Sequence, residues 1–135
     1  MLKHLMIVDD SDSDLLYGSV VAERAGIAQR VSTQEGAKEA LAFLQHPDGL
    51  DVDLIFLDIN MPGMDGFEFL EAFDALRAQG LVKASVVVML TSSPDRHDRD
   101  RAFSFTCVRD YMVKPVGVEA TRDMLQRLTA GGDRR

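Results

Sequence analysis

Asp58 has the clearest potential for chemistry, because of what precedes and follows it. The apolar run Leu54–Leu57 comes directly before it, and the loop formers Asn60, Pro62 and Gly63 follow. A continuous apolar run of this length predicts a strand covered on both faces. Asp58 then stands at the carboxyl end of a buried strand, where open α/β sheets bind their ligands. Because a buried charge costs free energy unless it is paired, we expect other segments to supply partners.

Three further strand-like runs end in such groups: residues 5–8 in Asp9 and Asp10, residues 86–90 in Thr91, and residues 110–113 in Lys114. Parallel strands end at one edge of a sheet, so these groups are expected beside Asp58. Carboxylates that share a cleft repel one another unless a cation offsets their charge. Mg²⁺ suits an all-oxygen site and also accepts phosphate as a ligand. A carboxylate forms an acyl phosphate when a phosphoryl group is presented in line and its charge is neutralised, which makes Asp58 a candidate nucleophile.

The rest of the chain predicts the helices and strands that hold these groups. Helices are expected to begin at Ser11 or Ser13, at Ser32 or Thr33, after Gly66, at Ser93 before Pro94, and at Val118. A short second strand is expected at residues 27–31. In the last helix, Ala120, Met124, Leu125 and Leu128 are expected to face inward.

Five strands alternating with five helices predict one α/β domain, a doubly wound parallel sheet with helices on both faces. We expect this domain to span residues 1–129 and residues 130–135 to form a flexible tail.

Composition and charge narrow the classes of function. The 135 residues are 46% hydrophobic and 27% charged, as in ordinary globular proteins. A net charge of −7 argues against a nucleic-acid-binding surface, which needs a basic stripe. Cys107 is the single cysteine, so a reducing compartment is expected. No segment has the pattern of a signal peptide or a membrane span, so we expect a cytoplasmic protein without a membrane partner.

The sequence resembles the receiver domain of two-component response regulators. The resemblance lies in the order and spacing of the acidic pair Asp9-Asp10, then Asp58, Thr91 and Lys114-Pro115. The resemblance covers about residues 5–128. It implies the flavodoxin-like strand order 2-1-3-4-5. It also implies that Asp58 accepts a phosphoryl group from a sensor histidine kinase or a histidine phosphotransfer protein.

The resemblance further implies a role for each site residue. Asp10, Asp58 and the backbone carbonyl of Asn60 are implied Mg²⁺ ligands, with Asp9 a weaker or water-mediated one. Thr91 and Lys114 are implied contacts of the phosphoryl group, and the Lys114–Pro115 peptide bond is implied to be cis. Tyr111 occupies the position of the switch aromatic, which turns inward when Thr91 moves toward the phosphoryl group.

The favoured function is a single-domain switch that binds a target protein when phosphorylated, through a face formed by the helix at 94–105, the strand at 110–113 and the last helix. A phosphorelay shuttle or a phosphate sink without a dedicated target is the alternative. A phosphatase with an aspartate nucleophile usually needs a second carboxylate two residues later, where this chain has Asn60. A flavin carrier would bind phosphate after the first strand, where the acidic residues repel it. We therefore expect no enzyme activity beyond self-phosphorylation and self-dephosphorylation. A phosphorylation-independent interaction module is the fourth possibility, but it would be expected to lack the site residues.

Two positions depart from the usual receiver pattern. Cys107-Val108 stands where Gly-Ala is common, and Val116 stands where Phe is frequent. Neither position belongs to the expected phosphate site. The bulkier pair before the last strand is expected to stiffen or reshape the loop beside the output face.

Overall fold

Within residues 1–92 and 94–130, which the computed structural model describes, five parallel strands form one sheet in the order β2-β1-β3-β4-β5. The strands are β1 (Leu2–Val8), β2 (Ala28–Gln34), β3 (Leu54–Leu57), β4 (Val86–Thr91) and β5 (Val108–Val113). All neighbouring strands pair in parallel. This order and pairing confirm the predicted fold.

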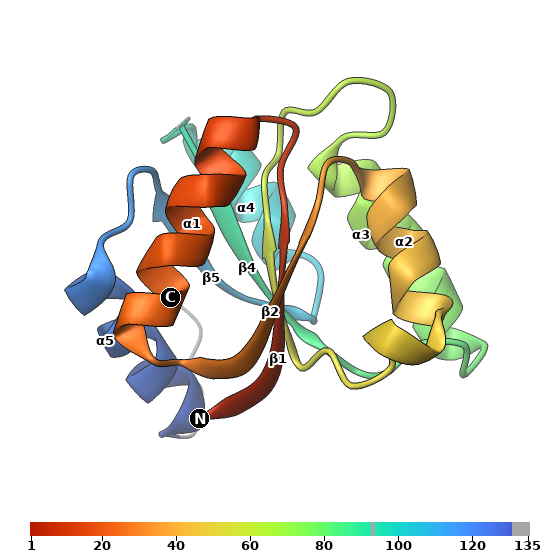
Figure 1. Cartoon of the computed structure of the whole chain (residues 1–135). Helices are drawn as coiled ribbons and strands as arrows, with labels where there is room; N and C mark the ends of the chain where they lie inside the picture. The colour runs from red at the N-terminus through yellow and green to blue at the C-terminus, as the bar shows by residue number, and fades with distance from the viewer. Residues whose placement is uncertain (93, 131–135) are drawn as a thin grey trace.

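The helices that connect the strands lie on both faces of the sheet. They are α1 (Asp12–Ala25), α2 (Ala37–Gln45), α3 (Gly66–Ala78), α4 (Arg96–Phe103) and α5 (Val118–Thr129), with a 3₁₀ turn at Pro47–Gly49. α1 and α5 cover one face, and α2, α3 and α4 cover the other (Figure 1). In the described part of the chain, no helix has the length and apolarity to span a membrane.

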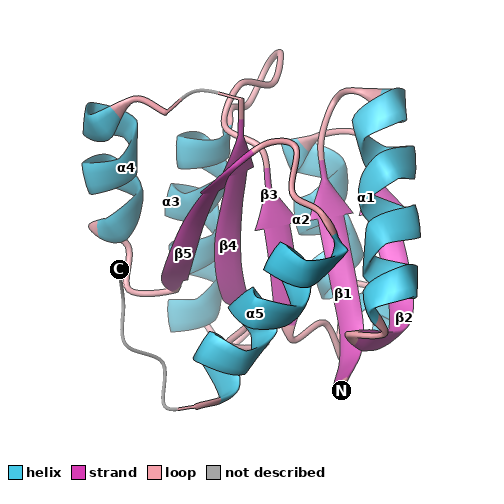
Figure 2. Ribbon diagram, turned by 90° about the vertical axis from the view of Figure 1, so that its left-hand side faces the viewer, coloured by secondary structure: helices cyan, strands magenta, loops and turns pink. Residues whose placement is uncertain are grey.

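Apolar side chains form a core on each face of the sheet. On one face, Phe69, Leu70 and Phe73 of α3 are fully buried. On the other, Leu15 of α1 and Met124 of α5 pack against the sheet. All four residues of β3 are buried between the two cores, as their apolar run predicts. Figure 2 shows the strands pointing in one direction, so their carboxyl ends meet at one edge.

The predicted start of the second helix is wrong. β2 continues to Gln34, so Ser32 and Thr33 pair with β1 and cap no helix. α2 begins after Gly36 without a side-chain cap. The strand is longer than its apolar part because polar residues can extend a ladder whose outer face meets solvent.

α4 is also shorter than predicted. It begins at Arg96, and the Asp95 side chain caps it by accepting a hydrogen bond from the His97 backbone N–H at 2.8 Å. The predicted cap, Ser93, lies outside the described residues.

The last strand and helix differ from the prediction in detail. β5 begins at Val108, two residues earlier than predicted, because Cys107 and Val108 are buried in the core. In α5, Ala120 is exposed, contrary to the prediction. Thr121 is buried there, and its hydroxyl donates to the Gly117 carbonyl at 2.8 Å. The proposed domain end at residue 129 coincides with the end of α5, and residues 131–135 lie outside the described part.

Candidate functional site

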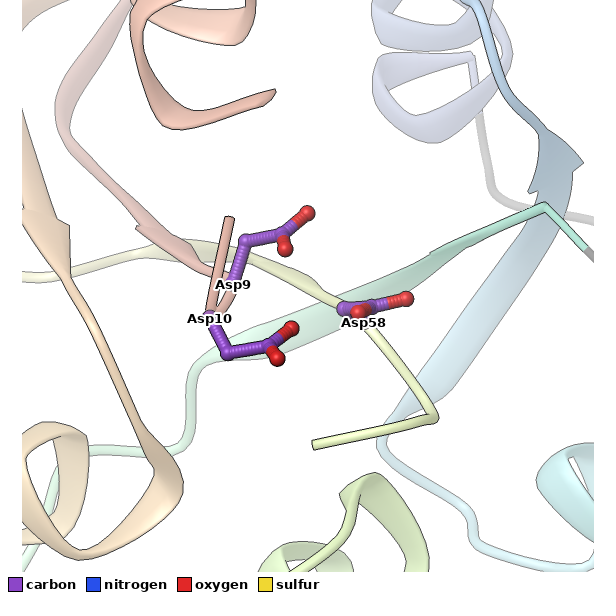
Figure 3. A group of neighbouring side chains, drawn as sticks. All are labelled: Asp9, Asp10 and Asp58. Carbon is purple, nitrogen blue, oxygen red and sulfur yellow. The ribbon is translucent and has the colours of Figure 1, made fainter. Parts of the chain in front are cut away.

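Three carboxylates meet at the carboxyl edge of the sheet. Asp9 and Asp10 follow β1, and Asp58 follows β3. Asp9 and Asp58 are buried, with 4% and 7% of their surfaces exposed, whereas Asp10 is exposed. One carboxylate oxygen from each residue lies within 4.8 Å of the others. Figure 3 shows the three side chains gathered at this edge.

The backbone around Asp58 is fixed by a hydrogen bond to the neighbouring strand and by a close contact with the start of α3. Its N–H donates to the Val8 carbonyl at 3.0 Å, which continues the pairing of β3 with β1. A Cβ atom added to Gly66 would lie 2.6 Å from the Asp58 carbonyl oxygen, so only glycine fits. Asp65 and Glu68 form a capping box that starts α3 at this glycine. The loop after Asp58 is therefore anchored at both ends.

The Asp9 carboxylate is fixed by two donors. Its Oδ1 accepts a hydrogen bond from the Ser11 backbone N–H at 3.0 Å, and its Oδ2 lies 2.5 Å from the Lys114 ammonium nitrogen. Of the two predicted caps of α1, Ser11 and Ser13, the structure has Ser11 as the N-cap, and its hydroxyl accepts a hydrogen bond from the Asp14 backbone N–H at 3.3 Å. The Asp9 side chain is thus held in place by these two contacts, whereas the Asp10 side chain is exposed to solvent.

Lys114 lies among three carboxylates. Its Nζ is 2.5 Å from Asp9, 3.0 Å from Asp14 and 3.5 Å from Asp58. The expected pairing with Asp58 is present as an ion pair, but the two hydrogen bonds go to Asp9 and Asp14. Asp14 is not among the site residues that the sequence predicts. Its place in the first turn of α1, four residues after the acidic pair, is the signal that could have found it.

Thr91 and Lys114 are joined through the backbone. The Lys114 N–H donates to the Thr91 carbonyl at 2.8 Å, and the Lys114–Pro115 peptide bond is cis, as the resemblance implies. Thr91 is fully buried at the end of β4. The two strand ends that carry the hydroxyl and the ammonium are therefore tied together.

The electrostatics of the cluster favour a bound cation. Burial, with the neighbouring Asp9 charge, raises the pKa of Asp58 to about 6, although Lys114 opposes the shift. Burial on its own would lower the pKa of Lys114, but hydrogen bonds to Asp9 and Asp14 and the Asp58 charge raise it overall. The positive charge of Lys114 is thus too little to offset the burial of the ionised Asp58 carboxylate and its repulsion by Asp9.

The donor set fits Mg²⁺. This ion prefers hard oxygen ligands, with one or two carboxylates, and it keeps several waters. The cluster offers three carboxylates, of which Asp10 faces solvent. Asn60, the expected source of a backbone carbonyl ligand, is exposed and follows the buried Ile59.

Tyr111 lies farther along the same edge of the fold. It is partly buried on β5, where it pairs in register with Met89 and packs against the core beneath α4. Burial, followed by the charges of Asp98 and Asp95, raises the pKa of its hydroxyl. Tyr111 is therefore next to α4, as a residue that links the site to the output face would need to be.

Val116, the second departure from the usual pattern, lines an apolar cavity next to the site. Tyr17 and Gly18 of α1 and Met124 of α5 also line it, and Lys114 lies at its polar side. Val116 therefore lies beside residues of both α1 and α5.

Several known proteins are similar to this chain in sequence. A sequence profile of the response regulator receiver domain matches residues 5–126. The heme response regulator HssR of Staphylococcus haemolyticus is 34% identical over 128 residues, which cover 93% of this chain and 49% of that protein. The probable methanogenesis regulatory protein FilR2 of Methanothrix harundinacea is 27% identical, with 92% and 79% covered. The chain thus spans about half the length of HssR.

Solved structures show the same fold. The chemotaxis protein CheY4 of Vibrio cholerae superposes with a TM-score of 0.76 at 31% identity, over 94% of this chain and 98% of that one. A two-component response regulator from Cytophaga hutchinsonii gives a TM-score of 0.83 over 96% and 98% of the chains, and its 23% identity supports the fold alone. Together with the profile match over most of its length, these likenesses show that the chain belongs to the response regulator receiver domain family of two-component systems.

Proposed function

We propose that this chain is a phosphorylation switch in which Asp58 is the phosphoacceptor. Receiver domains generally interact with histidine kinases or phosphotransfer proteins and with downstream targets. The observation that carries the proposal is the position of Asp58, a buried strand-end carboxylate 3.5 Å from the Lys114 ammonium and within 4.8 Å of two further carboxylates. We expect the protein to act in the cytoplasm and to catalyse only its own phosphorylation and dephosphorylation.

The phosphoryl group comes from a phosphohistidine on the donor protein. A lone pair of an Asp58 carboxylate oxygen forms the new O–P bond, while the N–P bond breaks and its electron pair returns to the imidazole. The switch is reset by hydrolysis. Water attacks phosphorus, the Asp58 O–P bond breaks, inorganic phosphate leaves and a proton passes to solvent. Both steps need positive charge around the phosphoryl oxygens.

The chain's own residues supply part of that charge and the positioning. Lys114 offers an ammonium group that turns from Asp9 and Asp14 toward a phosphoryl oxygen, and the Thr91 hydroxyl donates to another. Mg²⁺, held by Asp9, Asp10, Asp58 and the Asn60 backbone carbonyl, would neutralise further charge on the phosphoryl group. Gly66 lets the start of α3 lie close against the Asp58 backbone, because a side chain at position 66 would collide with the Asp58 carbonyl oxygen.

The output is proposed to leave through the face made by α4, β5 and α5. β5 is the last strand of the described sheet, and Tyr111 lies on it beneath α4. A phosphoryl group adds about −1.5 to −2 charge, which salt screens within about 8 Å. The signal must therefore pass mechanically, by movement of Thr91 and Lys114 and rotation of Tyr111.

Acetyl phosphate with Mg²⁺ tests the proposal directly. We expect intact mass spectrometry to show a single added phosphoryl group, and borohydride trapping to place it at Asp58. Asp58→Asn should abolish the label, whereas Asp48→Asn, which alters an exposed carboxylate away from the site, should leave it unchanged. Undiminished labelling of Asp58→Asn would overturn the assignment.

A phosphorelay shuttle or phosphate sink is the alternative use of the same site. It differs in output, because a shuttle needs no target that prefers one state. Beryllofluoride with Mg²⁺ mimics the phosphoryl group, so NMR spectra with and without it separate the two. Shifts in α4 and β5, together with at least tenfold tighter binding of a target protein, about 1.4 kcal/mol, support the switch. Equal affinities support the shuttle.

A further inference from the structure

Asp14 makes a contact that the proposed chemistry does not need. Its Oδ2 accepts a hydrogen bond from the Lys114 ammonium at 3.0 Å, across 100 positions of sequence. Asp14 belongs to the first turn of α1, and its side chain is 47% exposed. Lys114 is 19% exposed, so the pair lies at the rim of the site.

The two hydrogen bonds of Lys114 both go to carboxylates other than that of the phosphoacceptor. They run to Asp9 and Asp14, whereas Asp58 Oδ1 is 3.5 Å from the ammonium nitrogen. The ammonium group has a third N–H that can donate to a phosphoryl oxygen on Asp58, but the two existing hydrogen bonds fix its direction, so Lys114 can approach that oxygen more closely only by stretching them.

Asp9 and Asp14 differ in what happens to them when the site is filled. Asp9 belongs to the acidic cluster that fits Mg²⁺, and a dication beside it weakens its hold on a neighbouring ammonium. Among the described residues, the cluster that could hold a metal does not include Asp14. Its hydrogen bond to Lys114 therefore persists when Mg²⁺ is bound. It then competes with the phosphoryl group for the same ammonium.

We propose that Asp14 is a positioning residue that holds Lys114 in a resting orientation and so weakens the binding of a phosphoryl group at Asp58. This inference rests on the function proposed above. An exposed ion pair contributes up to about 1 kcal/mol, which corresponds to about fivefold in an equilibrium constant. Asp14 therefore tunes the occupancy of the phosphorylated state through its contact with Lys114.

The test is the affinity of the Mg²⁺-saturated protein for beryllofluoride, measured by calorimetric titration. Asp14→Asn should bind about two- to fivefold more tightly than the unmutated protein. Asp14→Glu, which keeps the charge, should restore part of the weaker affinity. Asp12→Asn is the matched control, because Asp12 is an exposed carboxylate in the same turn of α1. It reports the effect of removing one negative charge without removing the contact.

A double-mutant cycle separates positioning from general charge. In a Lys114→Gln background, Asp14→Asn should change the affinity no more than Asp12→Asn does. A ¹⁵N spectrum of the lysine ammonium groups in the metal-free protein gives an independent readout. The Lys114 signal should move in Asp14→Asn and stay in place in Asp12→Asn.

The outcomes distinguish this inference from the proposed function. If the unmutated protein binds no beryllofluoride with Mg²⁺, the phosphoacceptor proposal fails. If it binds, but Asp14→Asn equals Asp12→Asn or keeps its effect without Lys114, the role of Asp14 is overturned and the phosphoacceptor proposal stands.

Discussion

Two polar clusters lie toward opposite ends of the sheet, and they differ in how their charges are paired. Near the amino-terminal end of β1, His4 is fully buried. Its Nδ1 lies 2.7 Å from an Asp51 oxygen and its Nε2 lies 2.6 Å from the Ser32 hydroxyl. Asp53 accepts the backbone N–H groups of Lys3 and His4 at 3.0 and 3.1 Å. Each of these side chains has a partner of matching chemistry.

At the carboxyl end, the Lys114 ammonium is shared by three carboxylates, Asp9, Asp14 and Asp58, and the Asp10 carboxylate lies close to those of Asp9 and Asp58. The pKa directions differ accordingly. The hydrogen bond from His4 lowers the pKa of Asp51, whereas burial raises the pKa of Asp58 to about 6. A cluster that serves stability satisfies its own groups, and a site that serves a ligand leaves charge for the ligand to neutralise.

Breaking the satisfied cluster should have the largest effect on stability. His4→Ala removes a buried ring that packs edge-on against Phe43 at 5.8 Å and leaves the Ser32 hydroxyl without its partner. We expect the free energy of unfolding to fall by about 2 to 4 kcal/mol, measured by urea denaturation. His97→Ala, at an exposed position of α4, is the control and should change it by less than about 0.5 kcal/mol. Equal effects of the two variants would show that His4 has no special role.

Filling the unsatisfied cluster should stabilise the fold by a similar amount. Mg²⁺ at about 100 times its dissociation constant adds about 2.7 kcal/mol by mass action. Thermal unfolding with and without Mg²⁺ measures this gain. Asp10→Ala should lose most of it, because Asp10 is the exposed carboxylate of the cluster, and Asp12→Ala should retain it. A melting temperature of the unmutated protein that ignores Mg²⁺ would contradict a metal site.

The two clusters also differ in how far the sequence predicts them. Asp58 and its neighbours follow apolar runs, and parallel strands bring such strand ends together, so the group could be assembled from local pattern and topology. Nothing local links His4, Ser32 and Asp51. Ser32 was predicted to cap a helix, and its place in β2 depends on how far the ladder with β1 extends.

The errors within the site have the same origin. The Lys114 hydrogen bond to Asp14 depends on the orientation of α1 over the sheet, which periodicity does not determine. Ala120 was predicted to face inward in α5, but Thr121 is buried because its hydroxyl bonds to the Gly117 carbonyl within the helix. Side-chain hydrogen bonds allowed polar residues into places where hydrophobicity alone favoured apolar ones.

The smallest predicted effect concerns the charge of Asp58 itself, and its sign follows from the pKa. In the metal-free folded protein this pKa is raised from an ordinary value of 3.8 to about 6. The folded state therefore holds the proton more tightly than the unfolded state. The resulting stabilisation is fully present below pH 3.8 and is lost as the pH rises through about 6. Asp58→Asn has no proton to lose at this position, so its stability should not contain this decline.

Urea denaturation of both proteins between pH 4 and pH 7, without metal, measures the difference between the two curves. Groups that the two proteins share contribute to both curves, so the difference isolates the change at position 58. We expect Asp58→Asn to gain on the order of 2 kcal/mol relative to the unmutated protein across this range. Saturating Mg²⁺ should reverse the order at pH 7, because it binds the ionised carboxylate and the amide lacks the charge. Parallel curves without metal would mean that Asp58 is already satisfied, as His4 is, and the contrast between the two clusters would disappear.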